Sequence, residues 1–346
     1  MNLRLAAAFL TVHFALLATA PTVFALDSAL DTAADANKLQ AAVEAAGGTI
    51  EFSADDPAVP IAIDLYNGAN PLKGRGGKND AVNDAWLEQL TGLSSLKRLN
   101  LSNCAITNDG LRHVGRLKGL EELNLTLTPV SDEGLAHLAD LTHLQSLGLA
   151  STQCGGSGFA RLKGLSRLES VNFHFTPLDD AGLEAICSVG VSGRLWFAHT
   201  HFTDEGARHL AKLTKLRRCG IGSKHEASSG AAVAHLAKLP LEELSLLDRQ
   251  ATPEGVRHAA GIRSLRRLDV SYAPTLDDDA LAKLAAHPAL ESLTLGGSTE
   301  ITDAGILQLA ASRSLKQLEI RRCKNLTAAG IEQLKKANPA ITVVAP

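Results

Sequence analysis

The sequence predicts an α/β solenoid, a curved stack of similar coils with a parallel β-sheet on its concave face and helices on its convex face. Three observations predict it. A leucine-rich pattern recurs every 24 or 25 residues, and each copy joins a strand-like stretch to a helix-start signal. Only 9 Phe, 2 Trp and 2 Tyr occur in 346 residues, so the core must be aliphatic. Such a chain buries its apolar faces by stacking one unit on the next.

The chain begins with a segment typical of an export signal. Residues 1–25 contain one basic residue, Arg4, no acidic residue and a long apolar run that ends in small residues. We expect cleavage after Ala25, because Pro21 disfavours an earlier cut, and no nearby cysteine indicates a lipoprotein. The alternative is an uncleaved membrane anchor, since the run is just long enough to span a bilayer. In both cases the bulk of the protein is expected outside the cytoplasm, and we predict a secreted or periplasmic protein.

Residues 26–60 lie outside the repeat period and predict an N-terminal cap. A helix is expected over residues 35–46, where it ends at two glycines, and a strand over residues 49–52. Such a segment shields the first coil of a solenoid from water. A glycine-rich insertion with three positive charges, residues 68–78, then follows the first strand of the repeats.

Residues 61–346 are expected to form about eleven coils built on the pattern L-x-x-L-x-L. Its middle residue recurs at Leu99, Leu123, Leu147, Val171, Leu195, Cys219, Leu244, Leu268, Leu293 and Leu318. Alternate side chains of a strand point to opposite faces, so the aliphatic residues face the core and those between them face the concave surface. Because every connection is alike, the strands are expected to stack in parallel.

A second signal after each strand predicts where the helices begin. Most units continue with Thr or Ser, then Asp-x-Gly-Leu, as in residues 131–135. The residues that can cap the helix at this position are Thr107, Ser131, Asp179, Thr203, Thr252, Asp277, Thr302 and Thr327. Pro253 fits the first helical position, where a missing N–H costs nothing.

The unit resembles a leucine-rich repeat of the ribonuclease-inhibitor-like or cysteine-containing kind, and the resemblance covers residues 61–346. It implies a right-handed α/β horseshoe. Similar repeats are common in exported bacterial proteins.

Charge and motifs exclude several functions. A formal net charge of −3 lacks the positive field expected of a nucleic-acid binder. Gly155–Gly158 lacks the spacing of a nucleophile elbow, and His225 is not followed by the second histidine of a zinc-protease helix. The five cysteines are expected to be buried apolar side chains in separate coils, too far apart to bridge. We therefore expect no enzyme, no cofactor and no bound metal; a zinc site of His174, His199 and His201 is the weaker alternative.

Charged residues flank successive strands with alternating sign. Lys97 and Arg98 precede one strand, and Glu121 and Glu122 precede the next. Opposite charges on neighbouring strands support their stacking, so we interpret these residues as register marks.

The concave face is the predicted binding surface. Trp196 is a large aromatic residue there, and Gly220 and Gly222 on the next strand are expected to leave its ring uncovered, as in an interface anchor. The candidate binding residues are Asn172, His174, Phe175, Arg194, Trp196, His199, Arg218 and Tyr272. We expect a monomeric scaffold that binds a protein or peptide, with no nucleic acid as partner and membrane contact only if the signal is uncleaved. The alternative is a binder of cell-wall glycan or another small ligand stacked on Trp196.

Overall fold

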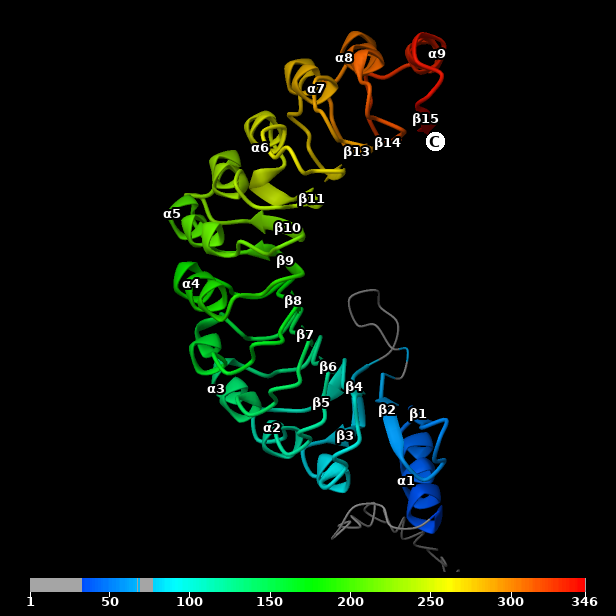
Figure 1. Cartoon of the computed structure of the whole chain (residues 1–346), viewed down its shortest axis with the longest axis vertical. Coiled ribbons are helices and arrows are strands. Elements are labelled where there is room, and N and C mark those ends of the chain that lie inside the picture. The colour runs from blue at the N-terminus through cyan, green and yellow to red at the C-terminus, as the bar shows by residue number, and fades with distance from the viewer. Residues whose placement is uncertain (1–32, 67, 69–76, 346) are drawn as a thin grey trace, which may run out of the picture.

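The computed structural model describes residues 33–66, 68 and 77–345, which form a curved solenoid (Figure 1). Its main sheet has 13 strands in the order β1-β2-β4-β6-β7-β8-β9-β10-β11-β12-β13-β14-β15. The first pair is antiparallel and the following pairs are parallel. The sheet lines the inner side of the curve and the helices the outer side (Figure 1), which confirms the predicted fold class. The predicted export signal lies outside the described residues.

The strands are short and follow the predicted period. The main sheet contains β1 (Thr49–Phe52), β2 (Pro60–Asp64), β4 (Arg98–Asn100), β6 (Glu122–Asn124), β7 (Ser146–Gly148), β8 (Ser170–Asn172), β9 (Arg194–Thr200), β10 (Arg218–Ser223), β11 (Glu243–Leu246), β12 (Arg267–Val270), β13 (Ser292–Gly296), β14 (Gln317–Arg321) and β15 (Thr342–Val344). A small parallel pair is formed by β3 (Asn79–Asn83) and β5 (Cys104–Ala105). Pattern residues of adjacent coils pair in register, as Leu99 with Leu123 and Leu123 with Leu147.

The outer side alternates short α-helices with 3-10 turns. The α-helices are α1 (Ala33–Ala45), α2 (Leu111–Val114), α3 (Asp132–Leu135), α4 (Asp180–Val189), α5 (Asp204–Ala207), α6 (Pro253–Ala259), α7 (Asp278–Ala285), α8 (Asp303–Gln308) and α9 (Ala328–Ala337). The 3-10 helices are η2 (Trp86–Leu90), η3 (Ala136–Leu138), η4 (Ser157–Arg161), η5 (Arg208–Lys212), η6 (Gly230–Leu236), η7 (Asp248–Gln250) and η8 (Leu309–Ala311). In the described part of the chain, none of these helices has the length and apolarity needed to cross a bilayer.

The N-terminal cap closes one end of the core. Leu39 and Val43 of α1 are buried against the first coils, and β1 extends the sheet antiparallel to β2. Helix and strand thus lie where the sequence places them.

The core is one continuous cluster of mostly aliphatic side chains, and it includes two pairs of aromatic rings near the middle of the stack. Phe159 and Phe173 lie 5.3 Å apart, as do Phe197 and Phe202, and all four rings are fully buried.

The cysteines are all free, and burial is confirmed for Cys104, Cys154, Cys187 and Cys219; for Cys323, which is only half-buried near the C-terminal end of the stack, the prediction is wrong. Burial raises the pKa of Cys104, Cys154 and Cys187 to about 12, so these thiols stay protonated and unreactive.

A column of acidic side chains joins consecutive coils where the helices begin. Asp180 shows the arrangement: its carboxylate accepts the Thr203 N–H at 2.6 Å and the Thr203 hydroxyl at 2.7 Å. The same acid-to-hydroxyl link joins Asp84 to Thr107, Asp204 to Ser229, Asp278 to Thr302 and Asp303 to Thr327. Gly230 and Pro253 hold the acid's position in two successive coils, so this link is missing twice in a row.

The glycine of the repeated motif makes room for that acid. A Cβ atom on Gly206 would overlap Oδ1 of Asp180 from the preceding coil, and one on Gly305 would overlap Asp278 in the same way. The sequence pattern Asp-x-Gly therefore records contact between neighbouring coils.

The predicted helix caps are partly confirmed. Asp179, Thr203, Thr252, Asp277 and Thr327 each accept an amide of their own helix. For Thr107, Ser131 and Thr302 the prediction is wrong: α2 begins later, after Gly110, and the other two side chains make no cap bond within the described residues. These three bind the linking side chain of the preceding coil instead.

Because His287 is buried, we expect the folded protein to lose stability in mild acid. The side chain is buried, with Nε2 3.1 Å from the Ile262 carbonyl oxygen and Nδ1 accepting the Ala289 N–H at 3.2 Å. Burial lowers the pKa of His287 below its ordinary value of 6.5. Because the unfolded chain then takes up the proton more readily, stability is lost as the pH falls below about 6.5.

We expect the urea midpoint of the wild type to fall more between about pH 7.5 and 5 than that of His287→Gln, which has no titrating group at this buried position and keeps the other histidines. Equal falls in the two proteins would contradict a role for this histidine.

Candidate binding surface on the concave face

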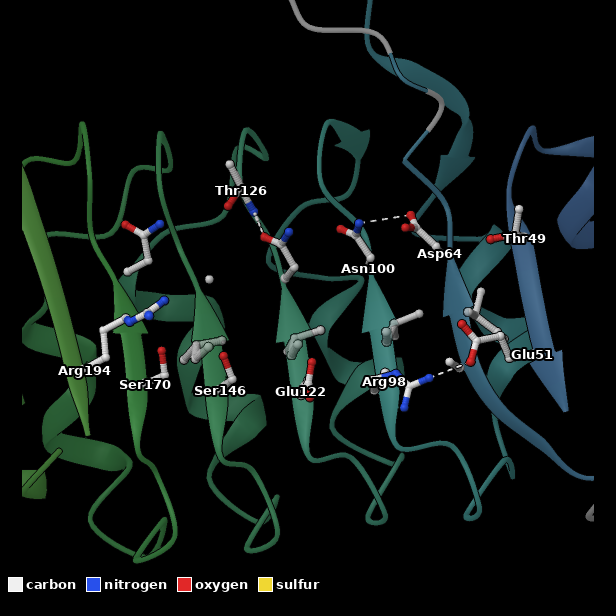
Figure 2. A pocket seen from close by; sticks show the side chains of 18 of the residues that line it. Thr49, Glu51, Asp64, Arg98, Asn100, Glu122, Thr126, Ser146, Ser170 and Arg194 are labelled. Carbon is white, nitrogen blue, oxygen red and sulfur yellow. Dashed lines mark hydrogen bonds and ion pairs between the residues drawn. The ribbon is translucent and has the colours of Figure 1, made fainter. Parts of the chain in front are cut away.

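Outward side chains of the first strands line a shallow hollow of about 460 Å³ that extends from β1 to β9 (Figure 2). They form two rows because strand residues alternate in direction. The first row contains Glu51, Arg98, Glu122, Ser146, Ser170 and Arg194. The second row contains Asp64, Asn100, Asn124, Gly148, Asn172 and Trp196. The floor over β7 and β8 therefore carries short polar side chains.

Asparagines of the second row shape the exit of each strand. Asn124 accepts the N–H of Thr126 at 3.0 Å, and Asn172 accepts the N–H of His174 at 3.0 Å. Within the described residues, the amide NH₂ groups of these two asparagines have no hydrogen-bond acceptor. The hollow thus offers free donors to a ligand, Asn172 among them.

Trp196 lies in the hollow, but its environment differs from the prediction. The side chain is only partly exposed, and a Cβ atom on Gly220 would overlap its Cε3 atom. The expectation that the neighbouring glycines leave the ring uncovered is therefore wrong, because the missing side chain of Gly220 lets the indole lie down on β10. The Arg194 guanidinium carbon lies 5.8 Å from the indole centroid. The ring face on β10 is closed to a ligand.

A more exposed aromatic group lies at the edge of the sheet. Phe175 is 53% exposed, and its ring stacks on His199 with 4.2 Å between centroids and 23° between planes. His174 is its other ring neighbour at 6.2 Å, and Lys224 Nζ lies 5.9 Å from the Phe175 centroid. Burial, and then the nearby His199, lower the pKa of His174, which keeps it neutral beside the stack.

At this edge of the sheet the backbone of one residue in most coils has a left-handed conformation, with positive φ, which few residues other than glycine adopt. These residues are Asn103, Leu127, Ser151, Phe175, His199, Asp248, Tyr272 and Arg322. The φ of Phe175 is 56° and that of His199 is 57°, so both rings project from equivalent turns of adjacent coils and meet.

Asp248 holds the stack in place and is not predicted from the sequence. Its Oδ1 lies 2.7 Å from Nδ1 of His199, and its Oδ2 accepts the His199 N–H at 2.6 Å. The Asp248 side chain is 8% exposed and reaches back over β10, where a Cβ atom on Gly222 would lie 2.7 Å from Oδ2. The signal in the sequence is the neighbouring Arg249. It stands three residues after the last core-facing residue of its strand, where four earlier coils have Thr128, Thr152, Thr176 and Thr200.

The remaining candidates are separated from this stack. Arg218 pairs in register with Arg194 on β9. Tyr272 is 73% exposed but lies at a second hollow, of about 200 Å³, with Arg321 and Arg322. No set of three ligating side chains suited to a metal occurs among the described residues, so the alternative zinc group of histidines is not assembled.

Comparisons with known proteins identify the repeat. A family model described as "Leucine Rich repeat" matches residues 92–113 and 120–139. No curated protein matches the sequence. An internalin from Listeria monocytogenes is similar in structure over 90% of this chain and 94% of its own, with 16% identity and a TM-score of 0.52.

Two other solved structures match a smaller part of this chain. TLR13, solved with ssRNA13, matches 76% of this chain at 21% identity and a TM-score of 0.50, and this chain spans 40% of its length. Rad7, solved with Elc1 in yeast, matches 76% of this chain and 79% of its own at 21% identity, with a TM-score of 0.46. At these identities the likeness concerns the fold.

Proposed function

We propose that this leucine-rich repeat protein is a non-catalytic, extracytoplasmic scaffold that binds a protein or peptide on its concave face. The exposed ring of Phe175 carries the proposal. It is fixed by the stack on His199 and, through His199, by the buried Asp248. A large aromatic side chain that is already ordered loses little entropy when a partner covers it, so it is suited to be an anchor.

The extracytoplasmic location is proposed from the predicted export signal. The apolar run and small residues of residues 1–25 support export to the periplasm or the medium, with cleavage after Ala25 or retention as an anchor. A monomeric scaffold would present one concave face to one partner.

The His199–Asp248 pair has the arrangement of a base and its orienting acid, but the surroundings favour binding. The adjacent hydroxyl of Thr200 is fully buried and donates to the Gly222 carbonyl at 2.8 Å. Phe175 covers one face of the imidazole. The arrangement holds a ring in place, and the neighbouring hydroxyl is not accessible to a substrate.

A nucleic acid is the less suitable partner, although TLR13 was solved with RNA. Glu122 and Asp64 line the same hollow as Arg98 and Arg194. A phosphate backbone carries negative charge along its whole length, so it would meet these carboxylates as well as the arginines.

Phe175→Ala is expected to weaken peptide binding at least tenfold, the loss typical of a truncated anchor. Peptides selected from a random dodecapeptide phage library on the full wild-type chain would be titrated against both proteins by fluorescence anisotropy. Leu307→Ala, which removes an exposed apolar side chain on the convex helix α8, is the matched control and should change affinity less than about twofold. Equal affinities for all three proteins would contradict the proposal, and binding on a glycan array in place of peptides would support the alternative ligand.

A further inference from the structure

At one place along the first row of the concave face, two like charges are direct neighbours. Arg98 pairs with Glu51 at 2.6 Å, and Arg267 pairs with Glu243 at 3.0 Å. Arg194 and Arg218, by contrast, are register partners on β9 and β10. Neither of them has an ion pair within the described residues.

This juxtaposition is unfavourable in the free protein. Neighbouring strands lie about 4.8 Å apart, and like charges directly opposite each other destabilise a sheet. The other register partner of Arg218 is Glu243, whose carboxylate is engaged by Arg267. A local conflict with no internal compensation is expected where a ligand supplies the missing charge.

The far wall of the hollow has the opposite charge. Glu122 on β6 and Asp64 on β2 line it together with Arg98 on β4, whose charge is balanced by Glu51; in the described part of the chain no cation pairs with Glu122 or Asp64. Between Glu122 and Arg194, the floor has only the short side chains of Ser146 and Ser170 in the same row (Figure 2). Three strand spacings, about 14 Å, separate the acidic wall from the basic wall.

We infer that the hollow binds an extended peptide segment with an acidic side chain over Arg194 and Arg218 and a basic side chain, about four residues away, over Glu122. An extended chain advances about 3.3 Å per residue, so four residues match the distance between the walls. The inference rests on the proposed function, because it names the chemistry of the partner on the same face.

The two arginines suit a carboxylate. Guanidinium groups bind carboxylates through two parallel N–H donors, and the nearby Trp196 ring favours a fixed position of the Arg194 side chain. The free amide donors of Asn172 lie in the next row of the same hollow. A uniformly anionic ligand fits less well, since Glu122 and Asp64 would repel it.

The test compares the full wild-type chain with the Arg194→Gln/Arg218→Gln double variant. Both would be panned against the random dodecapeptide phage library, and selected peptides would be synthesised and titrated. We expect wild-type peptides to contain an acidic and a basic residue about four positions apart, and to bind the double variant at least tenfold more weakly. Replacing the acidic residue of the peptide by its amide should cost the same factor on the wild type and nothing further on the variant.

Arg217→Gln is the matched control, because Arg217 is already paired with Glu242 at 3.0 Å and should leave the affinity unchanged. The melting temperature of the double variant should equal or exceed that of the wild type, since a repulsion is removed. A lower melting temperature would show that the arginines stabilise the fold and would overturn the inference.

The failures can be told apart. Selected peptides that depend on Phe175 but lack the charge pair, or that bind the double variant equally well, would overturn this inference alone. Selection of no peptide by the wild type would overturn the proposed function as well.

Discussion

Replacing Gly206 by alanine is expected to lower the free energy of unfolding by about 2–4 kcal/mol, from overpacking and lost hydrogen bonds. The added methyl group would occupy the space of the Asp180 carboxylate. The displaced carboxylate would lose both of its hydrogen bonds to Thr203, the one from the backbone N–H and the one from the hydroxyl. Urea denaturation followed by circular dichroism measures the change.

A double-mutant cycle identifies the cause. If the clash with Asp180 is responsible, Gly206→Ala should cost clearly less in an Asp180→Ala background, where the carboxylate is absent. Gly164→Ala is the matched control, because its new Cβ atom would meet only the Ala139 carbonyl oxygen, at an ordinary 3.6 Å. Equal costs in both backgrounds would assign the loss to another contact.

Asp248→Ala is expected to reduce stability by about 2–3 kcal/mol, because it removes the buried acceptor of the His199 N–H and the partner of the His199 ring. The released imidazole would no longer hold Phe175, so the affinity for a selected peptide should also fall. Urea midpoints and amide hydrogen exchange at His199 report the first effect, and anisotropy titration reports the second.

Two further variants test the contact between Asp248 and His199. Gly222→Ala would place a methyl group 2.7 Å from the Asp248 carboxylate oxygen and should produce a partial version of both effects. Asp248→Asn keeps an amide oxygen as acceptor and should fall between the wild type and the alanine variant. Faster exchange at His199 is required in all three; its absence would show that the stack does not depend on Asp248.

The sequence predicts the repeating framework well, because alternation and a fixed period are consequences of strand geometry. Leu123 and Leu147 must face the core once their neighbours do, so register follows from spacing alone. Buried Cys154 and Cys219 follow for the same reason, since they occupy columns of aliphatic residues.

The details of the candidate site depend on contacts between coils and are harder to predict. Alternation places Trp196 on the concave face, but its orientation is decided by the empty space above Gly220 on the next strand. Asp248 reaches across a whole strand to His199, a contact that no local pattern encodes. The sequence shows that a glycine recurs in the helix-start motif, but it does not show why. The structure gives the cause: the glycine leaves space for an acidic side chain of the preceding coil, as Gly206 does for Asp180, 26 residues earlier.

The two successive coils with Gly230 and Pro253 at the linking position lack the acid-to-hydroxyl link. On either side, acid-to-hydroxyl links tie neighbouring coils, from Asp204 to Ser229 before them and from Asp278 to Thr302 after them. In these two coils other side chains take over: Gln250 donates its amide to the Ser228 hydroxyl at 2.7 Å, and Arg257 lies 3.7 Å from the Asp277 carboxylate. The stack therefore stays joined from end to end, although the chemistry of the joint changes from a carboxylate to a buried amide and then to a surface ion pair.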